Sequence, residues 1–489
     1  MDLDVSAVSN EIDIPKTSLL DIDETLSQKR NKKIQRRKII RYSILGGGIA
    51  VIFIIIIIMI ISLGSSNSKN DEYSFSNVIK AKYHIEDKNE KIKIINKFTD
   101  DIKIKLFIND KEEKNFINEY QFKEKGDYSI DFKFNEELTD LTSLFKEIVN
   151  LIEIDLSGVK TNKVKSMENL FKECTSLEKA YLNNLDTSNL ESTKSLFEGC
   201  NNIQQIEMKN FNTKKVWNLE SMFKDCYNLT KIDINFFDLT NATNAYGMFS
   251  ECYKLEEIIL KNDELDSSII DMKSFFSHCH SLTKINLDNF KKKGLNNMTL
   301  MFDSCYSLDS VDLSKFDTSE ITSINSLFSN CKSLTSIDVS FMNFDKITDM
   351  SYTFSNCSSL KSIETKNFNT SNVLSMSGLF FGCSSLEAID LNITSYVVSD
   401  MKDLFNGCSN LTNVSLSVHQ ANIADRVFKG CNSLEYIDLT KFNGSGISLD
   451  ITDFFPKDVE NATIIYNSSI IGSVRNIIPN GWTQIDINN

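Results

Sequence analysis

The dominant pattern along the chain is a set of apolar positions that recurs about every 26 residues between positions 141 and 442. Each copy has Phe three residues before Cys and Leu or Ile three residues after it. Two further apolar residues then alternate with polar ones, as at Ile337 and Val339. This alternation predicts a short strand with one buried face. The apolar spacing near three from Met350 to Phe354 predicts a helical or 3-10 turn before the next Phe.

A single copy cannot bury its apolar edge alone, so the copies must stack on one another. We therefore expect an α/β-type leucine-rich-repeat solenoid of about twelve coils over residues 141–442, with one short parallel strand in each coil. Ile148 stands one period before Cys174 and takes the cysteine position in a leading coil.

The segments on either side of the repeat have patterns of their own. Residues 72–138 contain apolar/polar alternations such as VIKAKYHI and YSIDFKF, which predict a small β-rich domain that caps the N-terminal end of the solenoid. Residues 443–489 depart from the repeat, and we expect them to form the C-terminal cap, with Trp482 packing on the last coil.

Residues 44–63 are almost all apolar and carry no charge. A helix of that length spans about 30 Å, so we expect a single transmembrane helix preceded by a basic cluster between Lys29 and Arg41. Short basic flanks stay in the cytosol. The pattern therefore predicts a retained signal-anchor, a disordered cytosolic tail at 1–43 and an outer linker at 64–71. A cleaved signal peptide is the alternative, but it would begin earlier and be shorter.

The repeat resembles the BspA-like leucine-rich repeats of bacterial and protist surface proteins. The stretches that carry the resemblance are MFDSCYSLDSVDLSKFDTSEIT, from Met301, and LFFGCSSLEAIDL, from Leu379. The resemblance covers residues 141–442 and implies a parallel-strand solenoid with a role in adhesion or recognition. One copy is a residue longer than the others, and the last two intervals are shorter, which affects local coil geometry only.

The cysteines fall in one column of the repeat, and three roles compete for them. A zinc site needs closely spaced ligands, which the sequence lacks. Disulfides between neighbouring coils are sterically feasible, but the cysteine count is odd and Ile148 occupies the same position. We therefore predict a reduced, buried core column, because free Cys packs as a small apolar residue: Cys174, Cys200, Cys226, Cys252, Cys279, Cys305, Cys331, Cys357, Cys383, Cys408 and Cys431.

The outward strand position, seven residues after each Cys, is mostly acidic. One hypothesis is a stripe that binds a cationic partner or Ca²⁺; the alternative is that the acids keep the strand face soluble and form local bonds to Ser and Thr. The candidate residues are Glu207, Asp233, Asp312, Asp338, Glu364, Asp390 and Asp438. His278 and His280 flank Cys279, and we interpret them as part of a surface loop rather than a metal site.

The net charge of -14 argues against nucleic acid as a partner. The repeat shows no catalytic motif, and we expect no enzyme activity, cofactor or metal. The sequence therefore predicts a single-pass, N-in and C-out membrane protein that displays its solenoid at the cell surface to bind a protein or glycan. A structural coat protein, or the same topology in an internal membrane, remains open.

Overall fold

The computed structural model describes residues 75–488, apart from 90, 97–101, 115–117, 261–264, 286, 288–289, 293, 341, 366–367, 369, 397, 448–450 and 452. These residues belong to one compact unit, Phe75–Asn489. The predicted tail, the transmembrane segment at 44–63 and the linker lie outside the described residues. Within the described part, no helix is both long enough and apolar enough to cross a bilayer.

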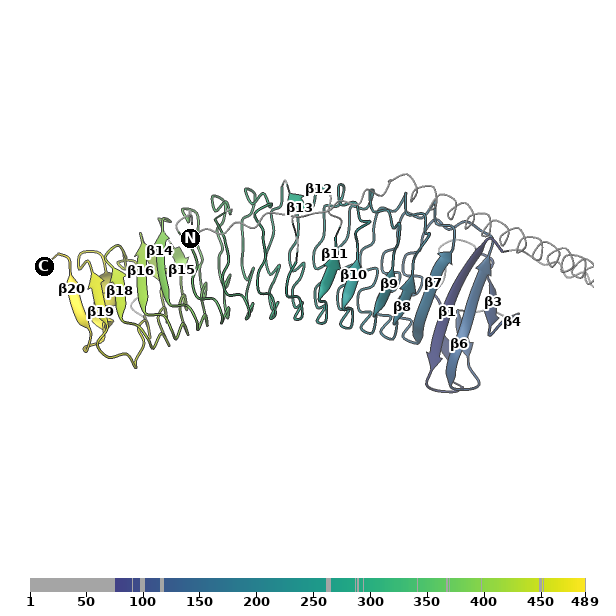
Figure 1. The fold of residues 1–489 in the computed structure, drawn as a ribbon, viewed down its shortest axis with the longest axis horizontal. Coiled ribbons are helices and arrows are strands. Elements are labelled where there is room, and N and C mark those ends of the chain that lie inside the picture. The colour runs from purple at the N-terminus through teal and green to yellow at the C-terminus, as the bar shows by residue number, and fades with distance from the viewer. Residues whose placement is uncertain are drawn as a thin grey trace, which may run out of the picture. The chain divides into compact units, whose positions relative to one another are not determined.

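An antiparallel sheet begins this unit. Its two long strands, β1 (Asn77–Ile85) and β6 (Gly126–Phe134), pair over their whole length, and alternate residues of β1 are buried. Because β1 also pairs with the first coil strand β7 (Leu151–Gly158), the sheet and the solenoid are continuous (Figure 1). The remaining strands here are β2 (Lys91–Lys93), β3 (Lys105–Ile108), β4 (Lys111–Glu113) and β5 (Glu119–Gln121).

The strands of successive coils pair in parallel and follow one another along a curved stack (Figure 1). The N-terminal run contains β8 (Lys179–Tyr181), β9 (Gln205–Glu207), β10 (Lys231–Asp233) and β11 (Glu257–Ile259). The C-terminal run contains β14 (Ala388–Ile393), β16 (Asn413–Val418), β18 (Tyr436–Leu439), β19 (Thr463–Tyr466) and β20 (Thr483–Asp486). Two separate parallel pairs join β12 (Leu265–Ser267) to β13 (Phe290–Lys292) and β15 (Val398–Asp400) to β17 (Ala421–Ile423).

Between the two runs the strand ladder is interrupted. Segments 309–313, 335–339 and 361–365 occupy the strand position of their coils but are not assigned as strands. Single backbone bonds still join these coils, for example from the Lys361 N–H to the Thr335 carbonyl at 3.3 Å.

The expected α/β class is wrong, because the solenoid is built from strands and turns. The one helix among the described residues is a short 3-10 helix, Gly472–Ile477. Just before and within each Phe-x-x-Cys, residues such as Ser326 and Asn330 have positive φ angles of 55° and 60°, which interrupt a right-handed helix. Alternate N–H groups then donate to the next coil, as from Phe328 to the Thr353 carbonyl at 2.8 Å.

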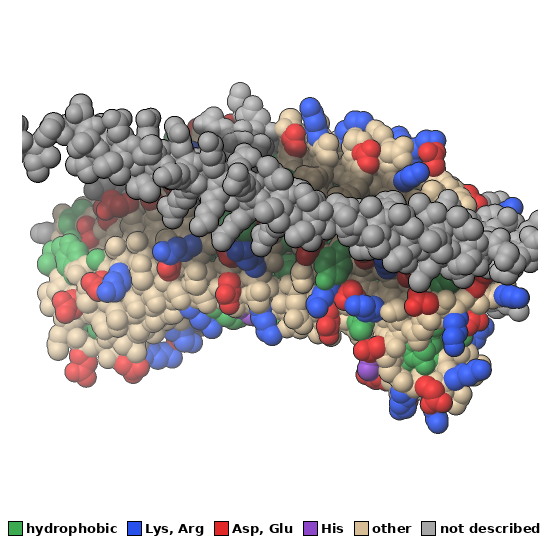
Figure 2. All heavy atoms as spheres, turned by 45° about the vertical axis from the view of Figure 1, so that its right-hand side comes forward, with side chains coloured by type: hydrophobic (Ala, Val, Ile, Leu, Met, Phe, Trp, Pro, Cys, Tyr) green, Lys and Arg blue, Asp and Glu red, His purple; other side chains and the backbone are tan. Residues whose placement is uncertain are grey.

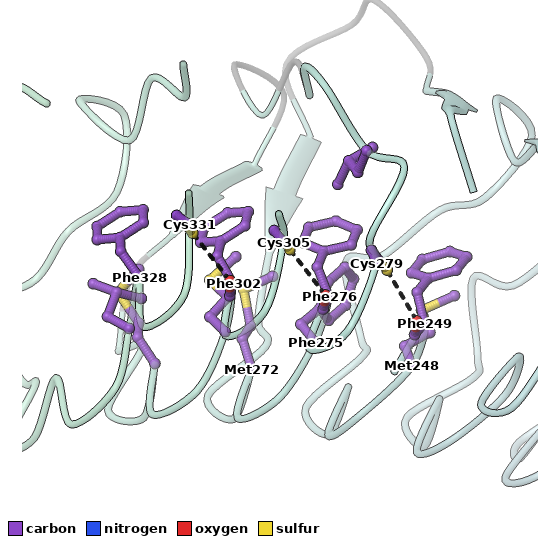
Figure 3. Packing of buried hydrophobic residues seen from close by; sticks show 14 of the residues in the cluster. Met248, Phe249, Met272, Phe275, Phe276, Cys279, Phe302, Cys305, Phe328 and Cys331 are labelled. Atoms are coloured by element: carbon purple, nitrogen blue, oxygen red, sulfur yellow. Dashed lines mark hydrogen bonds between the residues drawn. The ribbon is translucent and has the colours of Figure 1, made fainter. Parts of the chain in front are cut away.

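The core is a column of stacked phenylalanine rings with a column of thiols beside it (Figure 3). The ring of Phe302 lies 5.5 Å from that of Phe276 and 5.6 Å from that of Phe328, nearly parallel to the second. All three rings are almost fully buried. Each coil therefore buries its apolar edge against its neighbours, as the repeat requires.

The segment from residue 443 adds two strands to the C-terminal sheet: β18 pairs with β19, and β19 pairs with β20. Trp482 is buried, and its indole N–H donates to the Val459 carbonyl at 3.0 Å. Its ring contacts Phe455 edge-on, and Phe455 stacks on Phe428 of the last cysteine-containing coil. This segment thus extends the stack and packs on the phenylalanine column.

Candidate functional site

All eleven cysteines are free, buried thiols. Each sulfhydryl donates to the carbonyl of a phenylalanine one coil earlier, as from Cys305 to Phe276 and from Cys331 to Phe302, both at 3.2 Å (Figure 3). Burial raises the pKa of the thiols, to about 12 at Cys383. Protonated thiols are poor nucleophiles and poor metal ligands, so these buried thiols are poorly suited to catalysis or metal binding. The same bond reaches the leading coil, where Ile148 replaces Cys: Cys174 donates to the Phe145 carbonyl at 2.9 Å.

The strand register places the predicted stripe positions opposite one another. Asp390 lies opposite Ser415, and Ser415 lies opposite Asp438. Asp312, Asp338 and Glu364 take the same position in the three coils before β14, and all three are exposed. Four consecutive coils therefore present a carboxylate, and we call Asp312, Asp338, Glu364 and Asp390 the acidic row.

Turns within single coils hold two of these carboxylates. The Asp312 carboxylate accepts the Ser314 N–H at 2.8 Å, and the Asp338 carboxylate accepts the Ser340 N–H at 2.8 Å. Bonds from Ser314 to Asp312 and from Ser340 to Asp338 lower the pKa of both carboxyls, while the charge of Asp312 opposes this effect at Asp338. Both aspartates are therefore ionised at neutral pH.

The N-terminal half of the strand face is chemically different, because lysines accompany its acids. Lys231 pairs with Glu257 at 2.6 Å, and Lys82 pairs with Glu153 at 2.8 Å. Figure 2 shows acidic and basic side chains interspersed at this end of the molecule. Asp233 accepts the Asn235 N–H at 3.1 Å within its own coil. Glu207 accepts amide groups from Asn183 and Gln205 at 2.6 and 2.7 Å.

In the acidic row, the strand position two residues before each acid is occupied by a small, uncharged residue. These residues are Ser310, Ser336, Ser362 and Ala388, and all are exposed. Small side chains at this position leave the four carboxylates of the acidic row exposed to solvent.

A groove of about 900 Å³ begins at the C-terminal end of the acidic row. It lies where segment 361–365, which does not form a regular strand, meets β14, and it extends across β16 to Tyr436 on β18. Glu364 and Asp390 line it together with hydroxyl and amide groups, and no lysine or arginine is among its described lining residues. Sequence reasoning placed these acids in one row but gave no signal for the groove, which depends on the loss of strand pairing.

A second feature missed by sequence reasoning is a stack of rings at the position directly after Cys. The His280 ring lies between Tyr253 and Tyr306, with centroids 4.6 and 4.4 Å away and planes nearly parallel. Tyr227 extends the stack at 4.7 Å, and the Lys332 ammonium lies 4.4 Å from the Tyr306 centroid. The signal was available, because Tyr or His follows Cys in four consecutive copies.

His278 points toward acids of both neighbouring coils. Its Nδ1 lies 3.7 Å from Glu251 Oε1 and 3.8 Å from Asp303 Oδ2, and 2.9 Å from the Ser277 hydroxyl. Among the described residues, no group of three or more His, Cys, Asp or Glu side chains is arranged to hold a metal ion.

The His280 ring makes fold stability pH-dependent. Desolvation, followed by the charge of His278, lowers the pKa of His280, and its buried Nε2 has no hydrogen-bond partner in the described structure. Lys332 also lowers this pKa, while Glu251 and Asp303 raise it. Below the unfolded value of about 6.5 the unfolded chain binds more protons at this site, so stability falls as pH decreases.

His280→Tyr should keep the ring stack and reduce this acid sensitivity. The measurement is the urea unfolding midpoint at pH 7.5 and pH 5.5 for both proteins. The difference between the two proteins isolates the histidine, because all other titrating groups are shared. An equal acid shift in both would show that His280 does not contribute.

Comparison with known proteins identifies the repeat. Residues 139–262 and 263–363 match the family described as "Mycoplasma protein of unknown function, DUF285". Residues 325–448 match the "BspA type Leucine rich repeat region (6 copies)". Residues 325–448 belong to the BspA-type leucine-rich-repeat family. The resemblance noted in the sequence is therefore confirmed, and the groove and the acidic row, apart from Asp312, lie within residues 325–448.

Two of the solved structures similar to this chain are bacterial leucine-rich-repeat proteins. A leucine-rich repeat protein from Bacteroides ovatus ATCC 8483 is 20% identical, with a TM-score of 0.37, over 72% of this chain and 90% of that chain. A leucine rich cell surface protein from Faecalibacterium prausnitzii A2-165 is 19% identical, with a TM-score of 0.33, over 63% of this chain and 78% of that chain. No curated protein matches the chain.

Proposed function

We propose that this chain is a recognition or adhesion protein that binds a partner, without catalysis, through the strand face of its solenoid. Membership of the BspA-type family supports a ligand-binding or adhesion role. The observation that carries the proposal is the groove of about 900 Å³ between segment 361–365 and β18, since binding sites are concave and combine apolar walls with a few polar groups.

Family membership also supports a location at the cell surface, where such a partner would be met. The display of the solenoid by a membrane segment at 44–63 stays a prediction of the sequence alone, and the proposal does not depend on it. The partner is a protein or a glycan presented outside the cell. A structural coat protein, whose coils pack only on copies of themselves, is the competing function.

Blocking the groove should abolish recognition. Ala388 is exposed on β14 and lines the groove, so Ala388→Trp fills the space without removing a core contact. Binding of the purified full chain to an array of extracellular proteins and glycans should fall by at least about tenfold, the equivalent of roughly 1.4 kcal/mol.

The matched control is Asn410→Trp, which places the same side chain at an exposed turn outside the groove lining. It should bind as the unmodified chain does. Recognition through this groove would be contradicted if Ala388→Trp left the array signals unchanged. It would also be contradicted if sedimentation experiments showed self-association as the sole interaction.

A further inference from the structure

The groove adjoins a smaller hollow of about 320 Å³, and Asn392 on β14 lines both. The smaller hollow continues across β16 to His419 and Lys441. We propose that this joined surface binds a neutral oligosaccharide. The inference rests on the proposed function, because it names the partner class of the same groove. It is argued from the polar groups of the floor, from an exposed aromatic ring at the rim and from charge.

Strand register arranges the outward side chains of the floor as a grid. Asp390 lies opposite Ser415, and Asn392 lies opposite Ser417. Neighbouring positions are about 4.8 Å apart between strands and about 6.6 Å apart along one strand. Carboxylate, hydroxyl and amide groups therefore stand side by side, each within reach of a different group of one bound ligand.

This floor matches a ligand that carries many hydroxyl groups. A sugar hydroxyl both donates and accepts hydrogen bonds, so it pairs equally well with a carboxylate, which only accepts, and with an amide, which does both. At about 900 Å³, the groove alone is near the upper end of the range for drug-sized ligands, about 300–1,000 Å³. The occupant is therefore several sugar residues long.

An exposed aromatic ring at the rim independently indicates a ligand. Tyr396 is 82% exposed, more than any other large apolar side chain among the described residues. Its ring is nevertheless held in place, because it stacks on the His419 ring with centroids 5.6 Å apart and planes inclined by 24°. His419 lines the smaller hollow, so Tyr396 presents an apolar surface beside it that a ligand would cover.

Aromatic rings at two places complement the two kinds of surface on a sugar. A sugar ring carries hydroxyls around its edge and C–H groups on its faces, and the face of an aromatic ring is negative and attracts such groups. Tyr396 lies beside the smaller hollow, and Tyr436 lines the groove on β18. The rings would therefore contact sugar faces while the floor binds the hydroxyls.

A polypeptide fits this surface less well. Peptides that join a sheet pair with an edge strand, whereas β16, in the middle of the groove, already pairs with β14 on one side and β18 on the other. Protein partners also insert large side chains into apolar pockets. Here the apolar lining residues Phe368, Ile389 and Val414 are buried, so polar groups form most of the exposed floor.

Charge favours a neutral glycan over a polyanionic one. Glu364 and Asp390 line the groove, and its described lining contains no lysine or arginine. A sulfated or carboxylated sugar chain would place like charges beside these carboxylates, which disfavours binding. Lys441 lines the smaller hollow only, so it does not make the groove a site for polyanions.

The test measures binding of the full chain to sugars by affinity electrophoresis. Native gels contain a soluble β-glucan, mannan, galactan or xylan, with heparin as the polyanionic comparison. Tyr396→Ala removes the exposed ring, and Asn392→Ala removes the amide between the hollows. The matched controls are Tyr246→Ala and Asn410→Ala, which change exposed residues outside both linings. All four positions are exposed, so the variants should fold.

At least one neutral polysaccharide should retard the unmodified chain. Each of Tyr396→Ala and Asn392→Ala should weaken that binding by about fivefold or more, as expected for loss of an aromatic contact or of amide hydrogen bonds. The controls should stay within about twofold. The proposal would be overturned if no neutral polysaccharide retarded the chain, if heparin bound as tightly, or if the controls lost as much as the test variants.

The groove-blocking variant separates this inference from the function on which it rests. If Ala388→Trp abolishes binding to proteins of the array while no neutral polysaccharide binds, the groove is a recognition site but its partner is not a glycan. If Ala388→Trp changes neither the array signals nor the gel retardation, both proposals fail. Loss of polysaccharide binding in Ala388→Trp, with Asn410→Trp intact, supports both.

Discussion

Replacing Phe302 by Ala should lower the free energy of unfolding by about 3–5 kcal/mol. The ring is fully buried and stacks on Phe276 at 5.5 Å and on Phe328 at 5.6 Å. Truncation removes both ring contacts and leaves a cavity in the middle of the column. Because each coil contacts only its neighbours, the same change weakens the coupling between the two halves of the solenoid.

The matched control is Phe236→Ala, because Phe236 is 43% exposed and should lose less than about 1 kcal/mol. Urea unfolding followed by circular dichroism gives the two free energies. Hydrogen exchange should additionally show faster opening in the coils on either side of position 302. Similar losses in the two variants would contradict a stabilising phenylalanine column.

The period of the sequence was sufficient to predict this column. Phe and Cys recur at fixed separation in eleven copies, and stacked equivalent coils must bring equivalent residues together. The outward position of Asp312, Asp338 and Asp390 followed from the same period, since alternate strand residues face opposite sides. The repeating positions in the sequence were therefore sufficient to predict which residues lie in the core and which face outward.

The backbone between the columns was not predicted correctly. An apolar spacing near three suggested a helical turn before the Phe, but each coil has a residue with positive φ in this segment, as at Asn169 and Ser326, both at 55°. A better signal was present just before the last three cysteines, where Gly382, Gly407 and Gly430 occupy the same position with positive φ. Glycine recurring at one repeat position indicates a left-handed residue and argues against a helix.

The groove and the ring stack depend on interactions of individual coils, which the consensus of the repeat does not show. The groove lies where segment 361–365 fails to join the ladder of β14. The stack exists because His280 and three tyrosines occupy a position that other cysteine-containing coils fill with Thr, Asn, Ser or Lys. The groove and the ring stack therefore lie where individual coils differ from the consensus, which a period cannot reveal.

The thiol column predicts that the fold loses stability steeply at alkaline pH. Burial raises the pKa of every cysteine, to about 12 for Cys174, Cys383 and Cys431, whereas unfolded thiols ionise near pH 8.5–9. A group whose folded pKa is raised contributes stability that is present below the unfolded pKa. That stability is lost as pH rises toward the folded value.

One pH unit above the unfolded pKa, each thiol accounts for about 1.4 kcal/mol of lost stability. The eleven thiols together could therefore remove about 15 kcal/mol, which equals the whole stability of a typical domain at about 5–15 kcal/mol. The urea midpoint, measured by circular dichroism between pH 7 and pH 10 under reducing conditions, should fall sharply above about pH 8.5.

The control combines Cys305→Ala, Cys331→Ala and Cys357→Ala, which removes three titrating groups while keeping small side chains in the column. This variant should start less stable at pH 7, because it lacks three thiol bonds to carbonyls. Its free energy of unfolding should nevertheless fall less steeply with pH, because roughly three fewer protons are released on unfolding. Lysine and tyrosine titrations are common to both proteins, so identical slopes would show that the thiols do not cause the alkaline loss.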